Sequence, residues 1–339
     1  MKAFVIERYG KQEPLRLADV PEPMLGEQDV LVQVHAASIN PLDLKIRSGA
    51  LKRILPMRLP LVLGNDLAGV VMRVGTKVQR FKPGDEVYAR TDTHRIGAFA
   101  EFIALAESNL ALKPTSLTME QAASIPLVGL TAWQALVEKG NLRKGQKIFI
   151  HAGSGGVGTL AIQLAKHLGA SVATTTSSAN VALVKSLGAD IVIDYKKDDF
   201  AKTLRDYDLV LHSLGAEELE KSLVVLKPGG QLITLSGPPD PEFARNAGMP
   251  KLLQLIVGLL SRKIRKKAGQ HQVGYSFLFM RGSGEQLSTL GELIDSGVIQ
   301  PVIDKVFPFE ETENALAYVE AGRARGKVVV QVVAPDNRV

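Results

Sequence analysis

The feature that most constrains this chain is a glycine-rich loop in the middle of its 339 residues, His151-Ala-Gly-Ser-Gly-Gly-Val-Gly158. The apolar run before it, 147–151, predicts a strand, and the stripe of apolar residues after it, 157–168, predicts a helix. Glycines in this context let the backbone approach a pyrophosphate, and the helix N-terminus offers unpaired N–H groups to an anion. We therefore predict a dinucleotide phosphate site formed by Gly153, Ser154, Gly155, Gly156, Val157 and Gly158.

The segments after this loop continue to alternate between strand and helix patterns. Strands are predicted at 171–175, 191–195, 209–212 and 231–235, and helices at 178–187, 200–204 and 217–226. Strands separated by helices of this length are typical of a doubly wound parallel sheet, and the fold class is α/β.

The first part of the chain has a different pattern, with short Val-rich runs and frequent Gly and Pro. Strands are expected at 30–35, 70–74 and 97–104, and this density of turns favours a compact barrel-like domain. Short strands return at 306–309 and 327–333, on either side of a helix at 313–321. We predict a β-rich domain at 1–122, completed by 303–339, with a nucleotide-binding domain at 123–302 inserted into it.

The end of the second strand of the nucleotide-binding domain indicates which dinucleotide is bound. It contains Ala173-Thr-Thr-Thr-Ser-Ser-Ala-Asn180, with no acid before Asp190. NAD sites usually place Asp or Glu about 20 residues after the loop to bind the ribose 2′-hydroxyl. Hydroxyl groups can donate to a 2′-phosphate, which an acid would repel. NADPH is therefore the predicted cofactor, with Thr175, Thr176 and Ser177 beside it, although a hydroxyl-rich segment can also be a simple polar turn.

Composition excludes several other functions. The chain has no cysteine, and its six histidines have no metal-ligand spacing, so no metal site is expected. The net charge is +6, but the basic residues are scattered and no nucleic-acid-binding motif is present. The N-terminus lacks a signal-peptide pattern, and a cytoplasmic location is expected.

Several stretches together resemble the medium-chain dehydrogenase/reductase superfamily, and within it the zinc-free quinone oxidoreductases and alkenal/one reductases. They are Ala152–Gly158, Ser38-Ile-Asn-Pro-Leu-Asp43, Leu63-Gly-Asn-Asp-Leu-Ala-Gly69, Lys82-Pro-Gly-Asp-Glu-Val87, Gly97-Ala-Phe-Ala-Glu101 and Gly322-Arg-Ala-Arg-Gly-Lys-Val328. The resemblance implies a GroES-like catalytic domain, a Rossmann domain and a homodimer. It also implies NADPH-dependent, zinc-independent hydride transfer to quinones or to the C=C bond of α,β-unsaturated carbonyls.

The same resemblance implies roles for individual residues. Asn40 would lie near the nicotinamide ribose and the substrate, and Lys45 is a second candidate proton donor. Further cofactor contacts would come from Thr131, Tyr195, Ser236, Gly237, Phe277, Phe279 and Lys327. The zinc-dependent relatives carry catalytic ligands where this chain has Asn40, Asn65 and Val128, so a catalytic zinc is not expected. Asn180 stands where many members have a basic residue.

Other interpretations remain open at this point. Lys45 can be an ordinary solvated lysine. The chain can be an NADPH-binding redox sensor or structural protein without turnover. A methyltransferase on a similar sheet would require an acid where His151-Ala152 stands.

The least expected segment is Pro250–Lys267, an apolar run that ends in a cluster of positive charges. It can be an interfacial helix that contacts an anionic membrane. The preferred interpretation is a helix that covers a cleft or packs in a dimer, with its basic end in solvent.

Overall fold

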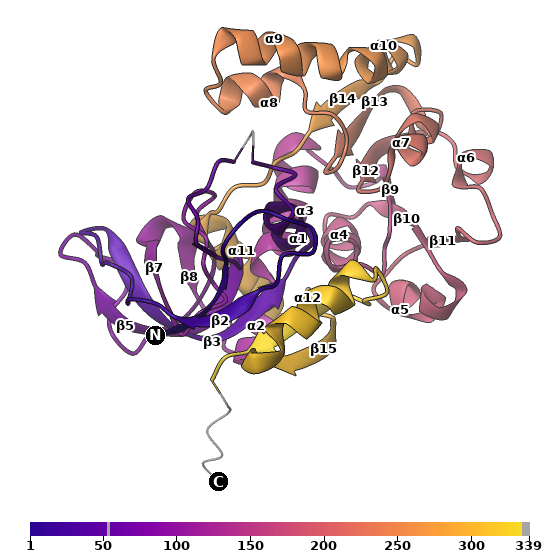
Figure 1. The fold of residues 1–339 in the computed structure, drawn as a ribbon. Coiled ribbons are helices and arrows are strands. Elements are labelled where there is room, and N and C mark those ends of the chain that lie inside the picture. The colour runs from indigo at the N-terminus through magenta and orange to yellow at the C-terminus, as the bar shows by residue number, and fades with distance from the viewer. Residues whose placement is uncertain (53–54, 334–339) are drawn as a thin grey trace. The chain divides into compact units, whose positions relative to one another are not determined.

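The computed structural model describes residues 1–52 and 55–333 (Figure 1). The chain forms two compact units, Met1–Leu130 with Arg281–Val339, and Thr131–Met280. These limits differ from the predicted 122/123 and 302/303. Helix α2 (Met119–Ala123) packs against strands β3 and β5, and helix α11 (Gly284–Asp295) packs against β8. Both helices therefore lie with the first unit, although their sequence pattern resembles the helices of the second.

The first unit is built mainly on antiparallel strands, with β15 and β16 as a parallel pair. A seven-stranded sheet has the order β15-β16-β3-β5-β6-β8, with β7 also paired to β3, and a three-stranded sheet has the order β2-β1-β4. The strands are β1 Lys2–Ile6, β2 Arg16–Asp19, β3 Asp29–Ile39, β4 Leu61–Val62, β5 Asp66–Val74, β6 Glu86–Arg90, β7 Phe102–Ala106, β8 Leu110–Leu112, β15 Ile303–Pro308 and β16 Lys327–Gln331. The other helices in or partly in this unit are α1 Pro41–Arg47, α3 Pro126–Trp133, α12 Thr312–Glu320 and the short 3₁₀ turns Glu107–Asn109 and Phe309–Glu311. β16 pairs antiparallel with β3, which joins the two ends of the chain in one sheet.

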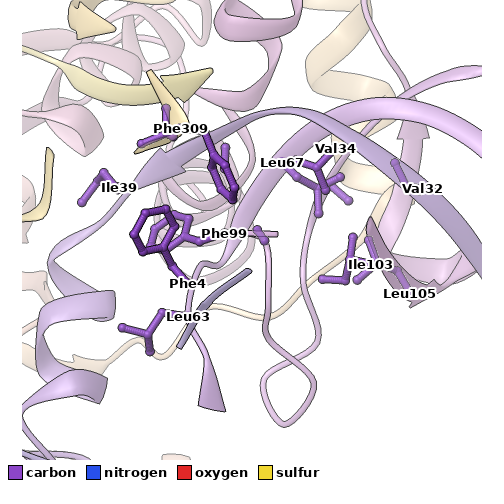
Figure 2. Close-up of a cluster of buried hydrophobic side chains, with 14 of the residues drawn as sticks. Phe4, Val32, Val34, Ile39, Leu63, Leu67, Phe99, Ile103, Leu105 and Phe309 are labelled. Atoms are coloured by element: carbon purple, nitrogen blue, oxygen red, sulfur yellow. The ribbon is translucent and has the colours of Figure 1, made fainter. Parts of the chain in front are cut away.

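The core of the first unit lies between these strands (Figure 2). Phe4 packs edge-on against Phe309, with 5.1 Å between ring centroids, so the first strand and the C-terminal segment share one cluster. Ile39 and Leu67 are buried in it at the ends of β3 and β5 that lead towards Asn40 and Asp66. The core therefore fixes the backbone on which those two polar residues are placed.

The second unit is a six-stranded parallel sheet with the order β11-β10-β9-β12-β13-β14. In chain order this is 3-2-1-4-5-6, the order of a doubly wound dinucleotide-binding fold, and the predicted fold class is confirmed. Its strands are β9 Lys147–Ile150, β10 Ser171–Thr176, β11 Ile191–Asp194, β12 Tyr207–His212, β13 Leu226–Thr234 and β14 Gly274–Phe277. Its helices are α4 Gly156–His167, α5 Val181–Ser186, α6 Phe200–Thr203, α7 Ala216–Ser222, α8 Pro241–Asn246, α9 Lys251–Leu260 and α10 Arg262–Gln270, with a π-helix at Gln134–Lys139 and a 3₁₀ turn at Ser178–Asn180.

Both faces of this sheet are buried. Phe149, Val210 and Leu232 pack with residues of α6, α7 and α10 on one face. Their neighbours Ile148 and Leu211 point to the opposite face because side chains alternate along a strand, and they are also buried. The near-continuous apolar runs in the sequence follow from this double burial.

Three predicted elements end elsewhere. The strand expected at 97–104 covers only Phe102–Ala106, because Gly97 has φ +146° and turns the chain away from an extended conformation. The helix expected at 217–226 ends at Ser222, since Leu226 already pairs with Tyr207 in the sheet. The strand expected at 306–309 begins earlier and covers Ile303–Pro308, where it pairs with β16.

Candidate functional site

The glycine loop connects β9 to α4 and leaves backbone donors available. Gly155 is the N-cap of α4 in an extended conformation, and no side chain accepts from the first turn. The N–H groups of a first helical turn have no partner within the helix. A Cβ on Gly158 would lie 2.4 Å from the carbonyl oxygen of Ala152, and one on Gly153 would lie 2.2 Å from Thr174 Oγ1. Only glycine fits these two positions.

The loop is held from beneath by β10. The N–H of Gly153 donates to the carbonyl of Thr175 at 2.9 Å, and the N–H of Ala152 donates to Thr175 Oγ1 at 3.1 Å. Ala152 has φ +51°, which L-residues other than Asn and Asp seldom adopt. The buried Thr175 hydroxyl therefore holds the loop, whereas the sequence suggested only a contact with the cofactor.

The hydroxyl groups at the end of β10 gather around Ser154. Thr176 Oγ1 donates to Ser154 Oγ at 2.9 Å, and Asn180 Nδ2 contacts Ser154 Oγ at 3.2 Å and Ser177 Oγ at 3.4 Å. Asn180 Oδ1 is buried and has no hydrogen-bond partner. The end of β10 is therefore polar and rich in hydroxyl groups, and the side chains of Thr176 and Asn180 contact Ser154 of the glycine loop.

The acid nearest to this cluster, Asp194 at the end of β11, is already bound. It accepts from Ser178 Oγ and from the N–H of Lys196, and these contacts, led by Ser178, lower the pKa of its carboxyl. Tyr195 is exposed, and its N–H donates to the carbonyl of Thr176 at 3.2 Å. Lys196 and Lys197 follow it and are also exposed. Sequence reasoning missed these two lysines, although a pair of cations directly after Tyr195 was a visible signal.

His212, at the end of β12, forms hydrogen bonds to Gly215 and to Thr234 at the end of β13. Its Nε2 lies 3.1 Å from the carbonyl of Gly215, which can only accept, so Nε2 carries the hydrogen. Nδ1 then accepts from Thr234 Oγ1 at 3.0 Å. Burial lowers the pKa of His212 to about 4, which keeps the ring neutral.

Thr234 in turn binds the backbone of the predicted cofactor residues Ser236 and Gly237. Its Oγ1 accepts from the N–H of Gly237 at 2.8 Å and from the N–H of Ser236 at 3.3 Å. The Ser236 hydroxyl donates to the carbonyl of Leu214 at 2.6 Å. The role of His212 could not be explained from the sequence. Through Thr234 it fixes the turn at Ser236 and Gly237.

The aromatic residues of the second unit lie after this turn. The N–H of Phe277 donates to Asp240 Oδ2 at 2.8 Å, and Phe243 contacts the rings of Phe277 and Phe279 at centroid distances of 5.1 and 6.0 Å. Thr131 is buried in α3. Phe277 and Phe279 therefore both pack against Phe243, and their contact with the nicotinamide stays a prediction.

In the first unit, Asn40 belongs to a buried polar network. Lys327 Nζ donates to Asn40 Oδ1 at 2.6 Å and to the carbonyl of Ile39 at 3.0 Å, and lies 3.6 Å from Asp66 Oδ2. Asn40 Nδ2 donates to Asp66 Oδ2 at 2.9 Å and to the carbonyl of Ser38 at 3.3 Å. Both amide hydrogens of Asn40 are therefore used inside the protein, which does not fit the predicted role of a donor to substrate.

The same network extends through Asp66 and Asp43. Asp66 Oδ1 accepts from the N–H of Leu127 at 2.8 Å. Asp43 accepts from the N–H of Asn40 and from Asn65 Nδ2, each at 2.7 Å. Complete burial raises the pKa of Asp43 to about 7, and burial also lowers the pKa of Lys327.

Lys45 lies outside this network. It is exposed on α1, two residues after Asp43. The two predicted catalytic residues therefore differ in environment: Asn40 is buried in the interior, and Lys45 is exposed to solvent.

The residues at the zinc-ligand positions do not fit a zinc ion. Asn40 and Asn65 both bind Asp43, and Val128 follows Leu127, which binds Asp66, so the three segments converge as the resemblance suggested. Two amides and a valine are poor zinc ligands. Among the described residues, no group of three or more His, Cys, Asp or Glu side chains could hold a metal.

The residues of the second unit do fit a dinucleotide. A Cβ on Gly153 or Gly158 would collide with the protein's own atoms, so glycine lets the loop close tightly. No side chain caps the first turn of α4, whose N–H groups can therefore bind a phosphate. Thr176, Ser177 and Asn180 line the end of β10, which is where the second strand of such a fold meets the ribose.

Comparison with known proteins agrees with this geometry. Residues 26–115 match the alcohol dehydrogenase GroES-like domain, and residues 187–330 match the zinc-binding dehydrogenase domain. The chain is 37% identical to the mitochondrial NAD(P)H oxidoreductase RTN4IP1 of Danio rerio, over 98% of this chain and 92% of that protein. It is also 37% identical to the chloroplastic NADPH-dependent alkenal/one oxidoreductase of Arabidopsis thaliana, over 97% of this chain and 79% of that protein.

Among solved structures, the quinone oxidoreductase from Coxiella burnetii superposes with a TM-score of 0.85 at 32% identity, over 98% of this chain and 99% of that one. The chain therefore belongs to the medium-chain dehydrogenase/reductase superfamily, in its zinc-free quinone oxidoreductase branch.

Proposed function

We propose that this protein is an NADPH-dependent reductase of quinones or of the C=C bond of α,β-unsaturated carbonyls. The observation that carries the proposal is the glycine loop at Gly153–Gly158, which closes tightly and leads into a helix N-terminus that no side chain caps. The relatives named as alkenal/one and quinone oxidoreductases support the substrate class.

The residues of the second unit would hold the cofactor by its phosphates and ribose. The amides of Gly156, Val157 and Gly158 would bind the pyrophosphate, and Ser236 and Gly237 would meet the nicotinamide half. NADPH supplies a hydride when bound. The protein supplies orientation and excludes water, because the buried Thr175 and the His212–Thr234 pair fix the two backbone segments before any ligand arrives.

The environment of the adenosine ribose favours NADPH over NADH. Hydroxyls of Thr176 and Ser177 stand where an acid would select NADH, and Asp194 is bound by Ser178. Tyr195, Lys196 and Lys197 lie on the next strand end and can approach a 2′-phosphate. We propose the two lysines as the cations that replace the basic residue missing at Asn180.

For the proton that completes the reduction, we propose Lys45 as the side-chain candidate. Its ammonium is exposed, whereas both amide hydrogens of Asn40 are used within the protein. We assign Asn40 the role of positioning the segment that leads into α1. Lys45→Met tests this: a lower rate with unchanged affinity for NADPH supports it, and an unchanged rate assigns the proton to water.

An NADPH-oxidation assay with 1,4-quinones, 2-alkenals and vinyl ketones tests the proposed function, with NADH as the alternative donor. Oxidation of NADPH by one of these classes, and slower oxidation of NADH, supports it. A protein that binds NADPH tightly but turns over none of them is a redox sensor or structural protein, the second candidate function. Zinc-dependent oxidation of a simple alcohol would contradict the proposal.

Two wider properties are also proposals. β14 and β11 are the edge strands of the parallel sheet, and pairing of one edge with a second copy would give the homodimer that the family implies. Light scattering of the purified protein tests the dimer. The cytoplasmic location expected from the sequence is tested by cell fractionation.

A further inference from the structure

Helix α9 carries its apolar residues on the side that faces solvent. Leu252, Leu255, Leu259 and Leu260 are 70%, 61%, 57% and 63% exposed, and Leu253 and Ile256 are also exposed. We call these six residues the α9 face. At 3.6 residues per turn they form one continuous stripe over roughly half of the helix circumference.

The opposite side of α9 is the one that packs on the protein, and it is narrow. Val257 is its one buried side chain, beside Gln254 and Gly258. A Cβ on Gly258 would lie 3.7 Å from Pro241 in the segment that begins α8. A helix on the surface of a soluble protein normally turns its apolar stripe inward, so α9 has the reverse polarity.

The helix is nevertheless held firmly in place. It continues through Ser261 into α10, where Ile264 and Ala268 belong to the core of the second unit. Ser261 Oγ accepts from Arg265 Nε at 3.2 Å, and Arg265 also donates to the carbonyl of Gly258 at 2.9 Å. The α9 face is therefore presented by a helix anchored to the core (Figure 1).

The segment that carries this face is strongly basic. Between Glu242 and Glu285 the sequence contains no Asp or Glu, and it contains Arg245, Lys251, Arg262, Lys263, Arg265, Lys266, Lys267 and Arg281. Lys263 and Lys267 pair with Glu220 from α7. Among the residues that the structure describes, Arg262 and Lys266 are exposed and have no acidic partner.

We propose that the α9 face and the cations of α10 form a docking surface for an anionic lipid membrane. Leucines beside lysines and arginines match the acyl boundary and the headgroup layer of such a membrane. Docking would be peripheral, since no helix in the described residues is long and apolar enough to cross a bilayer. If the same face of a second copy docked here, the cations of the two α10 helices would repel each other. An anionic lipid surface would instead attract them, which favours lipid as the occupant.

Co-sedimentation of the purified full-length protein with vesicles tests the proposal. We expect binding to vesicles that contain phosphatidylglycerol, weaker binding to phosphatidylcholine alone, and release by salt. Arg262→Gln with Lys266→Gln should weaken binding to anionic vesicles by about fivefold per charge removed. Leu255→Gln with Leu259→Gln should remove most of the remaining binding.

Matched substitutions elsewhere control for general effects. Leu17 and Leu112 are exposed leucines of the first unit, and Lys11 and Lys82 are exposed lysines there. Their changes to Gln should leave binding unaltered, and circular dichroism checks that every variant is folded.

Three outcomes would overturn the proposal. The first is no binding of the native protein to anionic vesicles. The second is that Leu255→Gln with Leu259→Gln dissociates a dimer in light scattering without reducing vesicle binding, which assigns the face to a subunit interface. The third is that this variant binds vesicles normally but loses turnover of a water-soluble quinone, which assigns the face to the substrate site.

Discussion

The glycine loop of the second unit and the polar network of the first both contain predicted site residues, and they are organised in opposite ways. In the network, Lys327 donates to Asn40, Asn40 donates to Asp66, and the Asp66 carboxylate lies beside the Lys327 ammonium. In the loop, no side chain caps the first turn of α4, and its amides have no partner within the helix. The network holds a conformation, whereas the loop is open to a ligand.

Substitutions in the two regions should therefore have different effects. Changes in the network should act first on stability, because they leave charges buried without partners. Changes in the loop should act first on cofactor affinity, because an added Cβ would displace the backbone that binds the ligand. Substitutions in the two regions test whether stability and cofactor affinity respond separately.

Asp66→Ala should destabilise the protein by about 3–5 kcal/mol, because it leaves the Lys327 ammonium buried without its counter-charge. Urea unfolding gives the free energy. The control is Glu27→Ala, which breaks an exposed ion pair with Lys77 and should cost less than about 1 kcal/mol. Similar losses in the two variants would mean that the network is not a buried ionic unit.

Asp43→Asn should change how stability depends on pH. The pKa of Asp43 is raised to about 7 in the folded protein from a reference value of 3.8, so the folded state binds the proton more tightly. The stabilisation from this proton is complete below the unfolded pKa and is lost as the pH rises through the folded pKa, at most about 1.4 kcal/mol per pH unit.

The measurement is unfolding of both proteins at about pH 5 and about pH 8. Relative to Asp43→Asn, the native protein should lose stability between these values. A stability difference that is independent of pH would show that Asp43 is ionised in the folded state.

Gly158→Ala should weaken NADPH binding by about one to two orders of magnitude, from an overpacking cost of about 1–3 kcal/mol. The added Cβ would lie 2.4 Å from the Ala152 oxygen and 2.6 Å from Gly153 Cα. Fluorescence titration measures the affinity. Gly269→Ala is the control, since a Cβ there meets nothing within 4 Å. Equal affinities in the two variants would place the pyrophosphate elsewhere.

Thr234→Val should cost about 1 kcal/mol of stability and raise the KM for NADPH, because it removes the acceptor for the N–H groups of Ser236 and Gly237. Thr203→Val, at an exposed helical position, is the control. A stability loss with an unchanged KM would show that the turn is structural and does not meet the cofactor.

Much of the second unit could be predicted from sequence, because its information is local. The strand, the glycines and the helix of the loop are adjacent in the chain, and the order of the parallel strands follows from their alternation with helices. The end of α7 at Ser222 was missed because it depends on the pairing of Leu226 with Tyr207, which no local pattern reveals.

The first unit could be predicted less well, because its site is assembled from distant segments. Asn40, Asp66, Leu127 and Lys327 meet only after the sheet has formed. The family resemblance suggested Asn40 and Lys327, but it could not reveal that both amide hydrogens of Asn40 are used. The role of His212 also needed the structure, since its partner Thr234 lies on another strand.

Hydrogen–deuterium exchange with and without NADPH tests the division between the two regions most directly. We expect NADPH to slow exchange of the amides at 156–158, in the first turn of α4, which no side chain caps. Little change is expected at 38–43 and 325–331, whose hydrogen bonds are already complete within the protein. Slowed exchange in the first-unit segments, with none in the glycine loop, would contradict the account.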